Sequence, residues 1–244
     1  MRPLLELARD KLKRRKVIAV MSGKGGVGKS VVASLLALNI RGSALIDLDL
    51  SGMSIPKLFG VSGKLHEVGR EGIEPIVVGG LKLFSLGGIV GDRYVVLPGY
   101  GQSGAVEALI AFAKLGDADT VIVDMPPGMG EELLALGRIA SYVPVVVTTP
   151  SKASYKVVKQ LVDYLIEAGR KPRAFILNMA YIECGGGARI YPFGRGDEAR
   201  RLGEDAGARV YEIPIDPSLE DYIGRLHEYR GPIAEAVRDV ARGL

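Results

Sequence analysis

Cysteine is nearly absent from the 244-residue sequence, and long apolar runs are missing altogether. The one cysteine, Cys184, excludes an intrachain disulfide. The longest uncharged stretches, residues 94–106 and 139–151, have 13 residues each, fewer than the roughly 18 that a membrane-spanning helix needs. Residues 1–16 are charged where a secretory signal has an apolar core. We therefore expect a cytoplasmic protein without membrane-spanning helices.

Excess charge of one sign is scarce except at the start of the chain. The formal net charge is +4, and residues 1–16 hold seven basic side chains against two acidic ones. Apolar residues at helical spacing in this segment predict a basic amphipathic helix. Two interpretations stay open, because the helix can dock its leucines on the domain or a sister subunit, or contact an anionic membrane or nucleic acid. Residues 17–244 contain no linker or repeat, so we expect one domain there.

Short apolar runs alternate with helical patterns along that domain. Runs rich in Val and Ile, typical of strands buried on both faces, lie at 17–22, 43–50, 120–123, 142–149 and 173–178. Patterns of helical period lie at 31–40, 105–114, 131–139, 152–168 and 197–206. The alternation predicts a doubly wound α/β fold with a mostly parallel sheet, and the glycine-broken segment 75–99 predicts a hairpin. Ligands of such folds bind at the carboxyl ends of the strands.

A phosphate-binding loop follows the first predicted strand. Residues 23–30 match the pattern G-x-x-x-x-G-K-[ST] between a strand and a helix, which is the context that this motif requires. Successive backbone N–H groups at the start of the helix can wrap phosphates there. Lys29 is expected to reach the β- and γ-phosphates, and the Ser30 hydroxyl to bind Mg²⁺. The predicted nucleotide-binding residues here are Gly23, Lys24, Gly25, Gly26, Val27, Gly28, Lys29, Ser30 and Val31.

Three aspartates end predicted strands near this loop. Asp47 and Asp49 are two residues apart, a spacing that places both carboxylates on one face of a strand, toward the phosphates. Because two like charges repel, a cation or a shared water is expected beside them. Asp124 ends the apolar run 120–123 and precedes Pro126-Pro127-Gly128, the arrangement of a Walker B acid that holds Mg²⁺ followed by a γ-phosphate sensor. The sequence thus predicts a magnesium site that includes Ser30 and Asp124.

The loop K-G-G-V-G-K-S resembles the deviant Walker A loop of the MinD, ParA, nitrogenase-iron-protein and Mrp/Nbp-type ATPases. The resemblance implies the SIMIBI type of P-loop fold and a homodimer that closes around ATP. It also implies that Lys24 crosses the dimer interface to the partner's nucleotide, where a cation supplied in trans stabilises the transferring phosphoryl group. By the same resemblance Asp49 orients the attacking water, and Asp47 supports the metal and the switch region.

The segment D-L-D-L-S-G-M-S-I-P-K-L-F-G, residues 47–60, is similar to the switch segment of Mrp/Nbp-type (ApbC-like) iron–sulfur cluster carrier ATPases. The motifs T-T-P at 148–150, N-M at 178–179, F-G at 193–194 and I-P-I-D-P at 213–217 follow in that family's order. This resemblance covers nearly the whole chain from about residue 16. It implies that Asn178 contacts the adenine edge with its amide and that Pro214 and Asp216 border the base.

The sequence departs from the family pattern at four positions. Val31 stands where the family has a second hydroxyl residue, and Met53 and Met129 replace a Pro and a Thr of the switch segments. The family's C-x-x-C pair is reduced to Cys184, which three glycines follow. Cys184 is therefore the one candidate cysteine ligand for an iron–sulfur cluster.

The function that these motifs predict is Mg²⁺-dependent hydrolysis of ATP by a homodimer. The resemblance implies iron–sulfur cluster carriage or assembly, with client or assembly proteins as partners. The alternative is a MinD/ParA-like positioning switch whose residues 1–16 contact a membrane or nucleic acid. The motifs S-I-P, F-G and I-P-I-D-P favour the carrier, whereas the missing second cysteine and the basic segment favour the switch.

Overall fold

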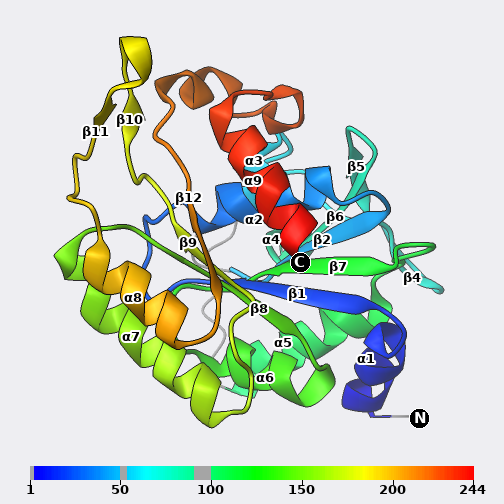
Figure 1. The fold of residues 1–244 in the computed structure, drawn as a ribbon. Coiled ribbons are helices and arrows are strands. Elements are labelled where there is room, and N and C mark those ends of the chain that lie inside the picture. Colours follow the sequence, from blue (N-terminus) through cyan, green and yellow to red (C-terminus); the bar gives the residue numbers. More distant parts are fainter. Residues whose placement is uncertain (1–2, 50–53, 91–99) are drawn as a thin grey trace.

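The computed structural model describes residues 3–49, 54–90 and 100–244. Eight strands of these residues form one sheet in the order β12-β9-β8-β1-β7-β2-β6-β5. All neighbours pair in parallel except β5 and β6, which confirms the predicted mostly parallel sheet (Figure 1). The strands are β1 Lys16–Met21, β2 Ser43–Asp47, β5 Ile76–Val78, β6 Leu81–Ser85, β7 Thr120–Asp124, β8 Val143–Thr148, β9 Ala174–Leu177 and β12 Arg209–Glu212.

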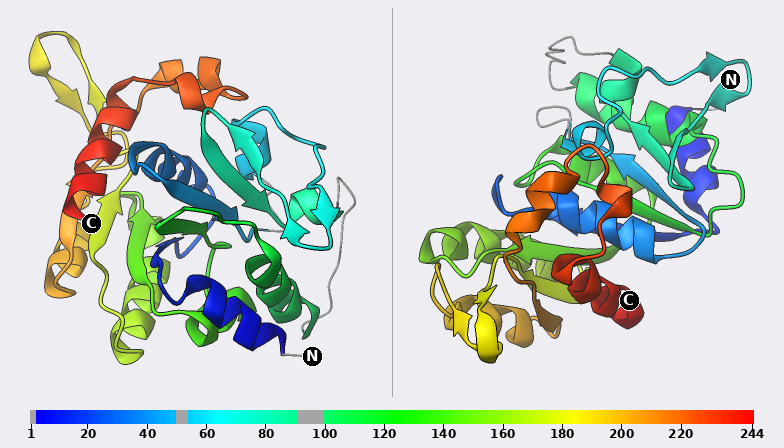
Figure 2. Two further views of the ribbon diagram at one scale, coloured as in Figure 1. Left: turned by 90° about the vertical axis from the view of Figure 1, so that its right-hand side faces the viewer. Right: turned by 90° about the horizontal axis from the view of Figure 1, so that it is seen from above.

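Helices cover both faces of the sheet, as a doubly wound fold requires (Figures 1 and 2). One apolar core lies between the sheet and α1 Leu4–Leu12, α5 Tyr100–Phe112, α6 Glu131–Ile139, α7 Lys152–Glu167 and α8 Asp197–Asp205. The other lies under α2 Lys29–Asn39, α3 Ser54–Leu58 and α9 Pro232–Gly243. The central strands are buried on both faces, which explains their continuous Val- and Ile-rich runs.

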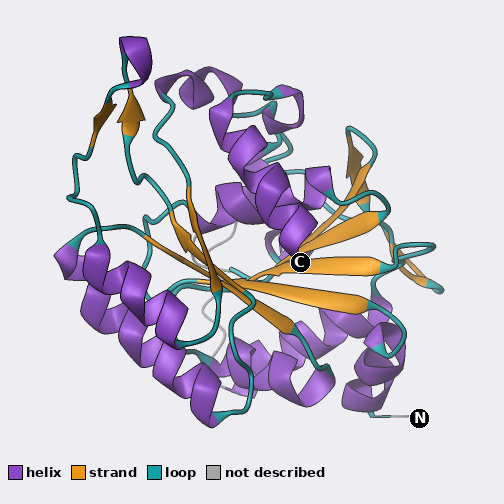
Figure 3. Ribbon diagram, in the orientation of Figure 1, coloured by secondary structure: helices purple, strands orange, loops and turns teal. Residues whose placement is uncertain are grey.

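Short elements complete the described chain. Two small hairpins are formed by β3 Val68–Gly69 with β4 Gly72–Ile73, and by β10 Ile182–Glu183 with β11 Arg189–Ile190. The remaining helices are α4 Gly87–Val90 and the 3-10 turns η1 Gly185–Gly187, η2 Pro217–Tyr222 and η3 Leu226–Glu228. Figure 3 shows that the β10–β11 hairpin projects beyond the main sheet.

The predicted elements are all present among the described residues, with ends shifted by a few residues. The hairpin expected within 75–99 is the antiparallel pair β5–β6, while residues 91–99 lie outside the described part. The strand expected at 43–50 ends at Asp47, so the two acids at 47 and 49 do not share one regular strand. The strand β12 and the helix α9 were not predicted.

Apolar packing and hydrogen bonds from basic side chains hold the first helix and the residues just after it on the domain. In α1, Ala8 and Leu12 are buried in the core, and the helix packs against α5 and α6. Arg9 and Arg15 donate hydrogen bonds to the backbone carbonyls of Arg138 and Ala118, each at 2.8 Å. The helix therefore docks on the domain, and Arg9 within it and Arg15 just after it bind backbone carbonyls of the protein.

Within the described ranges, no helix combines the length and apolar character needed to cross a bilayer. This finding agrees with the expectation from the uncharged stretches. The cytoplasmic location stays a prediction.

The docking of α1 is testable through its two terminal leucines. Leu12 is 2% exposed and Leu4 is 38% exposed. Leu12→Ala should lower the free energy of unfolding by about 2–5 kcal/mol, because it leaves a cavity in the core. Leu4→Ala, as the matched control, should change it by less than about 1 kcal/mol. Urea denaturation followed by circular dichroism measures both, and equal midpoints for the two variants would show that α1 does not contribute to the core.

Candidate functional site

The glycine-rich loop joins β1 to α2, and two glycines fix its course. Gly28 adopts a left-handed conformation (φ 81°) directly before α2 begins, a backbone that glycine adopts without a steric penalty. A Cβ at Gly23 would lie 2.7 Å from the backbone of Val157 in α7, so only glycine fits there. Above Gly25 and Gly26, by contrast, a Cβ would meet nothing within 4 Å. The loop is thus packed underneath and open above, where its N–H groups can meet an anion.

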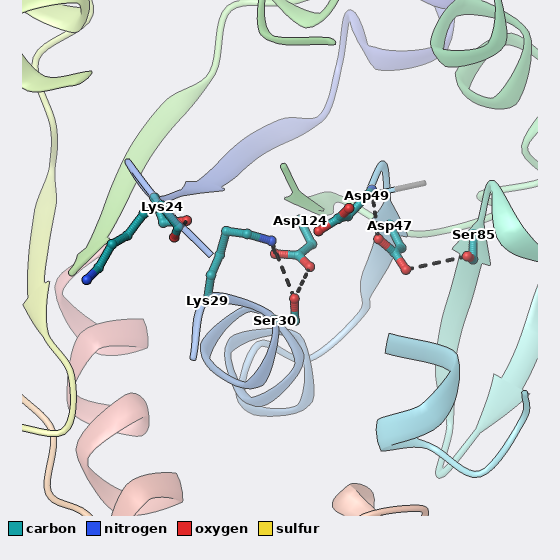
Figure 4. Close-up of polar contacts among 8 residues, drawn as sticks. Lys24, Lys29, Ser30, Asp47, Asp49, Ser85 and Asp124 are labelled. Carbon is teal, nitrogen blue, oxygen red and sulfur yellow. Dashed lines mark hydrogen bonds and ion pairs between the residues drawn. The ribbon is translucent and has the colours of Figure 1, made fainter. Parts of the chain in front are cut away.

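A buried ion pair connects this loop to β7. Lys29 Nζ lies 2.6 Å from Asp124 Oδ1, and the Ser30 hydroxyl donates to Asp124 Oδ2 at 2.6 Å (Figure 4). Lys29 is 6% exposed and Asp124 is fully buried. Burial raises the pKa of Asp124, while the Lys29 ammonium and the hydrogen bonds from Lys29 and Ser30 oppose that rise. The structure thus brings together Lys29, Ser30 and Asp124, the residues that the sequence analysis assigns to phosphate and metal binding.

Asp47 and Asp49 point in different directions. The Asp47 carboxylate accepts hydrogen bonds from the backbone N–H of Asp49 at 3.0 Å and from the Ser85 hydroxyl at 3.4 Å (Figure 4). Asp49 lies beyond the end of β2 and lines the cavity beside the glycine-rich loop. Asp47 does not line this cavity. Of the two acids expected to face the phosphates, Asp49 lines the cavity, whereas the Asp47 carboxylate lies against Ser85. The alternation rule does not apply because the strand ends at Asp47.

Electrostatics at this edge of the sheet favour a cation. Burial raises the pKa of Asp47 well above its usual range, and the negative charge of Asp124 raises it further. Lys29 is the cation that lowers the pKa of both buried acids. Within the described ranges, no group of three or more His, Cys, Asp or Glu side chains could hold a metal by itself. Oxygen donors from Ser30 and the aspartates fit Mg²⁺, which characteristically takes one or two carboxylates together with substrate phosphates.

A cavity of about 550 Å³ lies beside the loop, a size typical of small-molecule sites. The predicted residues 24–31 and Asp49 line it. Further lining residues are Ser22, Ser54, Lys57, Leu58, Pro127, Met179, Glu220 and Ile223. Among the described residues, Met179 is the one non-glycine with a positive φ (56°), a conformation that often marks functional sites. Ser54, Lys57, Leu58, Pro127 and Met179 belong to motifs that the sequence analysis names, whereas no motif marked Ser22, Glu220 and Ile223.

The residues expected at the base, Asn178, Pro214 and Asp216, do not line the cavity. Asn178 follows β9, is buried, and donates from Nδ2 to the carbonyl of Val27 at 2.8 Å. The amide nitrogen of Asn178 therefore supports the phosphate loop. The contact with adenine stays a prediction, and it would use the amide oxygen Oδ1. Neither Pro214 nor Asp216 lines the cavity. The Asp216 carboxylate instead accepts hydrogen bonds from the Ser218 and Tyr229 hydroxyls.

Lys24 extends away from the Lys29–Asp124 pair (Figure 4). It is partly exposed, lines the cavity, and forms no ion pair with any described residue. A cation in this position is available to a group outside its own subunit. Met129, in the second switch segment, is half exposed, and Met53 lies outside the described residues.

Cys184 lies at the root of the glycine turn between β10 and β11, far along the chain from the loop. Its backbone N–H donates to the carbonyl of Ala188 at 2.8 Å, and its thiol is free and partly exposed. No described His, Cys, Asp or Glu group with metal-holding geometry includes it. One chain therefore offers a single thiolate at this hairpin.

Comparisons with known proteins agree on one family. A ParA-type family model, described as NUBPL iron-transfer P-loop NTPase, matches residues 13–242. The iron-sulfur cluster carrier protein of Saccharolobus solfataricus is 33% identical over 215 residues, which cover 84% of this chain and 72% of that protein. The chloroplastic Fe-S cluster assembly factor HCF101 of Oryza sativa subsp. japonica is 33% identical over 221 residues, or 88% of this chain, and the chain spans 41% of that factor's length.

The fold is also found among solved structures. The nucleotide-binding protein of Archaeoglobus fulgidus, solved in complex with ADP, has a TM-score of 0.80 and is 32% identical to this chain. The match covers 95% of this chain and 96% of that protein.

The Lys29–Asp124 pair predicts coupled stability effects. Lys29→Met leaves a buried carboxylate without its cation, so we expect a loss of about 3–5 kcal/mol in the free energy of unfolding. Asp124→Asn in the same background should restore part of this loss, because the uncompensated charge is gone. A double-mutant cycle by urea denaturation, without nucleotide or metal, measures the coupling. Additive effects, within about 0.5 kcal/mol, would contradict a stabilising contact between the two side chains.

Proposed function

Because the chain belongs to the family of NUBPL iron-transfer P-loop NTPases, we propose that it is a Mg²⁺-dependent ATPase that closes as a homodimer around ATP and carries iron–sulfur clusters to client proteins. The observation that carries this proposal is the buried contact of Lys29 and Ser30 with Asp124 beside a glycine-rich loop that is open above Gly25 and Gly26. A cytoplasmic location is part of the proposal.

The proposed nucleotide chemistry follows from where the side chains lie. The loop N–H groups and Lys29 bind the phosphates, and Asp124 keeps Lys29 and Ser30 in place before the nucleotide arrives. Ser30 and Asp124, with Asp47 behind them, would hold Mg²⁺, which when bound neutralises charge on the β- and γ-phosphates. Asp49, in the cavity wall, orients the attacking water.

The proposed dimer gives Lys24 its role. Since its ammonium points away from its own Lys29–Asp124 pair, we assign it to the partner's nucleotide. A cation that arrives only when two subunits close makes hydrolysis depend on dimerisation.

The iron–sulfur cluster is the proposed cargo. Four thiolates hold a [4Fe–4S] cluster in most proteins, and a two-fold dimer of this chain supplies one Cys184 from each subunit. The missing ligands would come from an external thiol or from a client protein. We propose the carrier ahead of the positioning switch, because α1 docks on the domain and Arg9 and Arg15 donate hydrogen bonds to backbone carbonyls.

Lys24 and Asp49 should have different effects on the dimer. Lys24→Ala should prevent ATP-dependent dimerisation and lower turnover, whereas Asp49→Ala should still bind ATP and accumulate as a dimer, because water is no longer oriented. Size-exclusion chromatography with light scattering, with and without Mg–ATP, measures this, together with phosphate release. The exposed Lys13→Ala serves as the control for loss of one lysine charge. Identical monomeric profiles for the Lys24 and Asp49 variants would refute the assignment.

Cluster binding should depend on an added thiol. After anaerobic reconstitution with iron and sulfide, the protein alone should hold little iron, because two cysteines per dimer are too few. With glutathione present, iron content should rise, and Cys184→Ser should abolish that rise while ATP hydrolysis continues. Absorbance and iron analysis per dimer give the answer. A stable brown dimer with about four irons formed by the protein alone, and lost in Cys184→Ser, would show that the chain ligates a complete cluster without help.

A further inference from the structure

Two charged side chains at the cavity have no part in the phosphate chemistry described above. Lys57 on α3 and Glu220 on η2 both line the cavity and are both exposed. Among the described residues, neither side chain forms an ion pair or a hydrogen bond. Glu220 is thus an unpaired acceptor facing the space where a nucleotide would bind.

The beginning of η2 is fixed by Asp216. Its carboxylate accepts hydrogen bonds from the backbone N–H of Ser218 at 3.0 Å and from the Ser218 hydroxyl at 2.8 Å. The hydroxyl of Tyr229, which is buried, donates to the same carboxylate at 2.5 Å. Burial alone would raise the pKa of Asp216, but these three hydrogen bonds hold it below its usual value. Asp216 therefore acts as a cap that positions the helix bearing Glu220.

The end of η2 is held against the switch side of the cavity. The N–H of Gly224 donates to the carbonyl of Leu58 at 3.1 Å. A Cβ at Gly60 would lie 2.4 Å from the carbonyl oxygen of Gly224, so the two backbones are in direct contact. Because both ends of η2 are fixed, Glu220 is presented to the cavity by a rigid element, which reduces the entropic penalty of binding.

The chemistry of the surrounding wall suits a sugar. Val31, Leu58, Met179 and Ile223 give this part of the cavity apolar surface, whereas the phosphate loop supplies the anion-binding part. Besides Asp49, Glu220 is the one acid among the described lining residues. A carboxylate accepts hydrogen bonds from ribose hydroxyls in other nucleotide-binding folds, and the Lys57 ammonium can only donate.

We propose that Glu220 is a specificity-determining residue whose carboxylate accepts hydrogen bonds from the ribose hydroxyls of the bound nucleotide. The proposal rests on the nucleotide binding proposed above. It assigns ribose selection to η2, with Asp216 as a positioning residue, although the sequence had placed Asp216 at the base.

Calorimetric titration with Mg–ADP, Mg–2′-deoxy-ADP and Mg–3′-deoxy-ADP tests the assignment without hydrolysis. The unmodified protein should bind ADP about tenfold more tightly than at least one deoxy analogue, because a charge-assisted hydrogen bond is lost. Glu220→Ala should bind ADP and both analogues equally, and Glu220→Gln should keep part of the preference. Asp221→Asn, which removes the adjacent acid that does not line the cavity, should behave like the unmodified protein.

The contradicting outcomes are distinct from one another. If Glu220→Ala keeps the full preference for ADP, the ribose assignment is wrong. If it loses the preference for ADP over GDP but keeps that for ribose, Glu220 contacts the base, and the assignment is again wrong. If the unmodified protein binds no nucleotide, both this inference and the proposed function fail.

Discussion

The buried ion pair between Lys29 and Asp124 joins the start of helix α2 to the end of strand β7, 95 residues later in the chain. It exists because β7 inserts between β1 and β2, so that Asp124 pairs in register with Val20 on one side and Asp47 on the other. A lysine and a serine at the start of α2 meet this carboxylate, and all other site residues are arranged around that contact. The pair compensates the charge of the buried Lys29 ammonium.

The same packing separates the cavity into parts with different chemistry. The glycine-rich loop, supported from behind by Asn178 and by the backbone of α7, forms the anion-binding part. The switch helix α3 and the turn η2, in contact through Gly60 and Gly224, form the opposite wall. Asp49 lies between them.

Much of the fold could be predicted from the sequence, because the central strands are buried on both faces and appear as uninterrupted Val- and Ile-rich runs. The edge strand β12 was missed because Arg209–Glu212 is short, carries a charged residue at each end and is largely half exposed. Helix α9 was missed although Ile233, Val237 and Val240 have helical spacing and are buried. The expected family was confirmed, since its motifs are local in sequence.

The site was predictable where short motifs mark its residues, even when these motifs lie far apart in the chain, and not where no motif marks the contact. Lys29, Ser30 and Asp124 come together as expected. The direction of Asp47 depends on Ser85, and the place of Glu220 depends on Tyr229 and on the contact with α3, none of which a linear pattern contains. The basic character of residues 1–16 likewise did not reveal that carbonyls over a hundred residues away accept hydrogen bonds from Arg9 and Arg15.

The most direct measurement of the central claim is calorimetric titration of the protein with ATP, with and without Mg²⁺, alongside Lys29→Ala. The account predicts one ATP bound per chain, tighter binding when Mg²⁺ is present, and no measurable binding by Lys29→Ala, because water cannot replace the charge-assisted contact in the loop. Unchanged affinity in Lys29→Ala, or no binding by the unmodified protein at millimolar ATP, would contradict it.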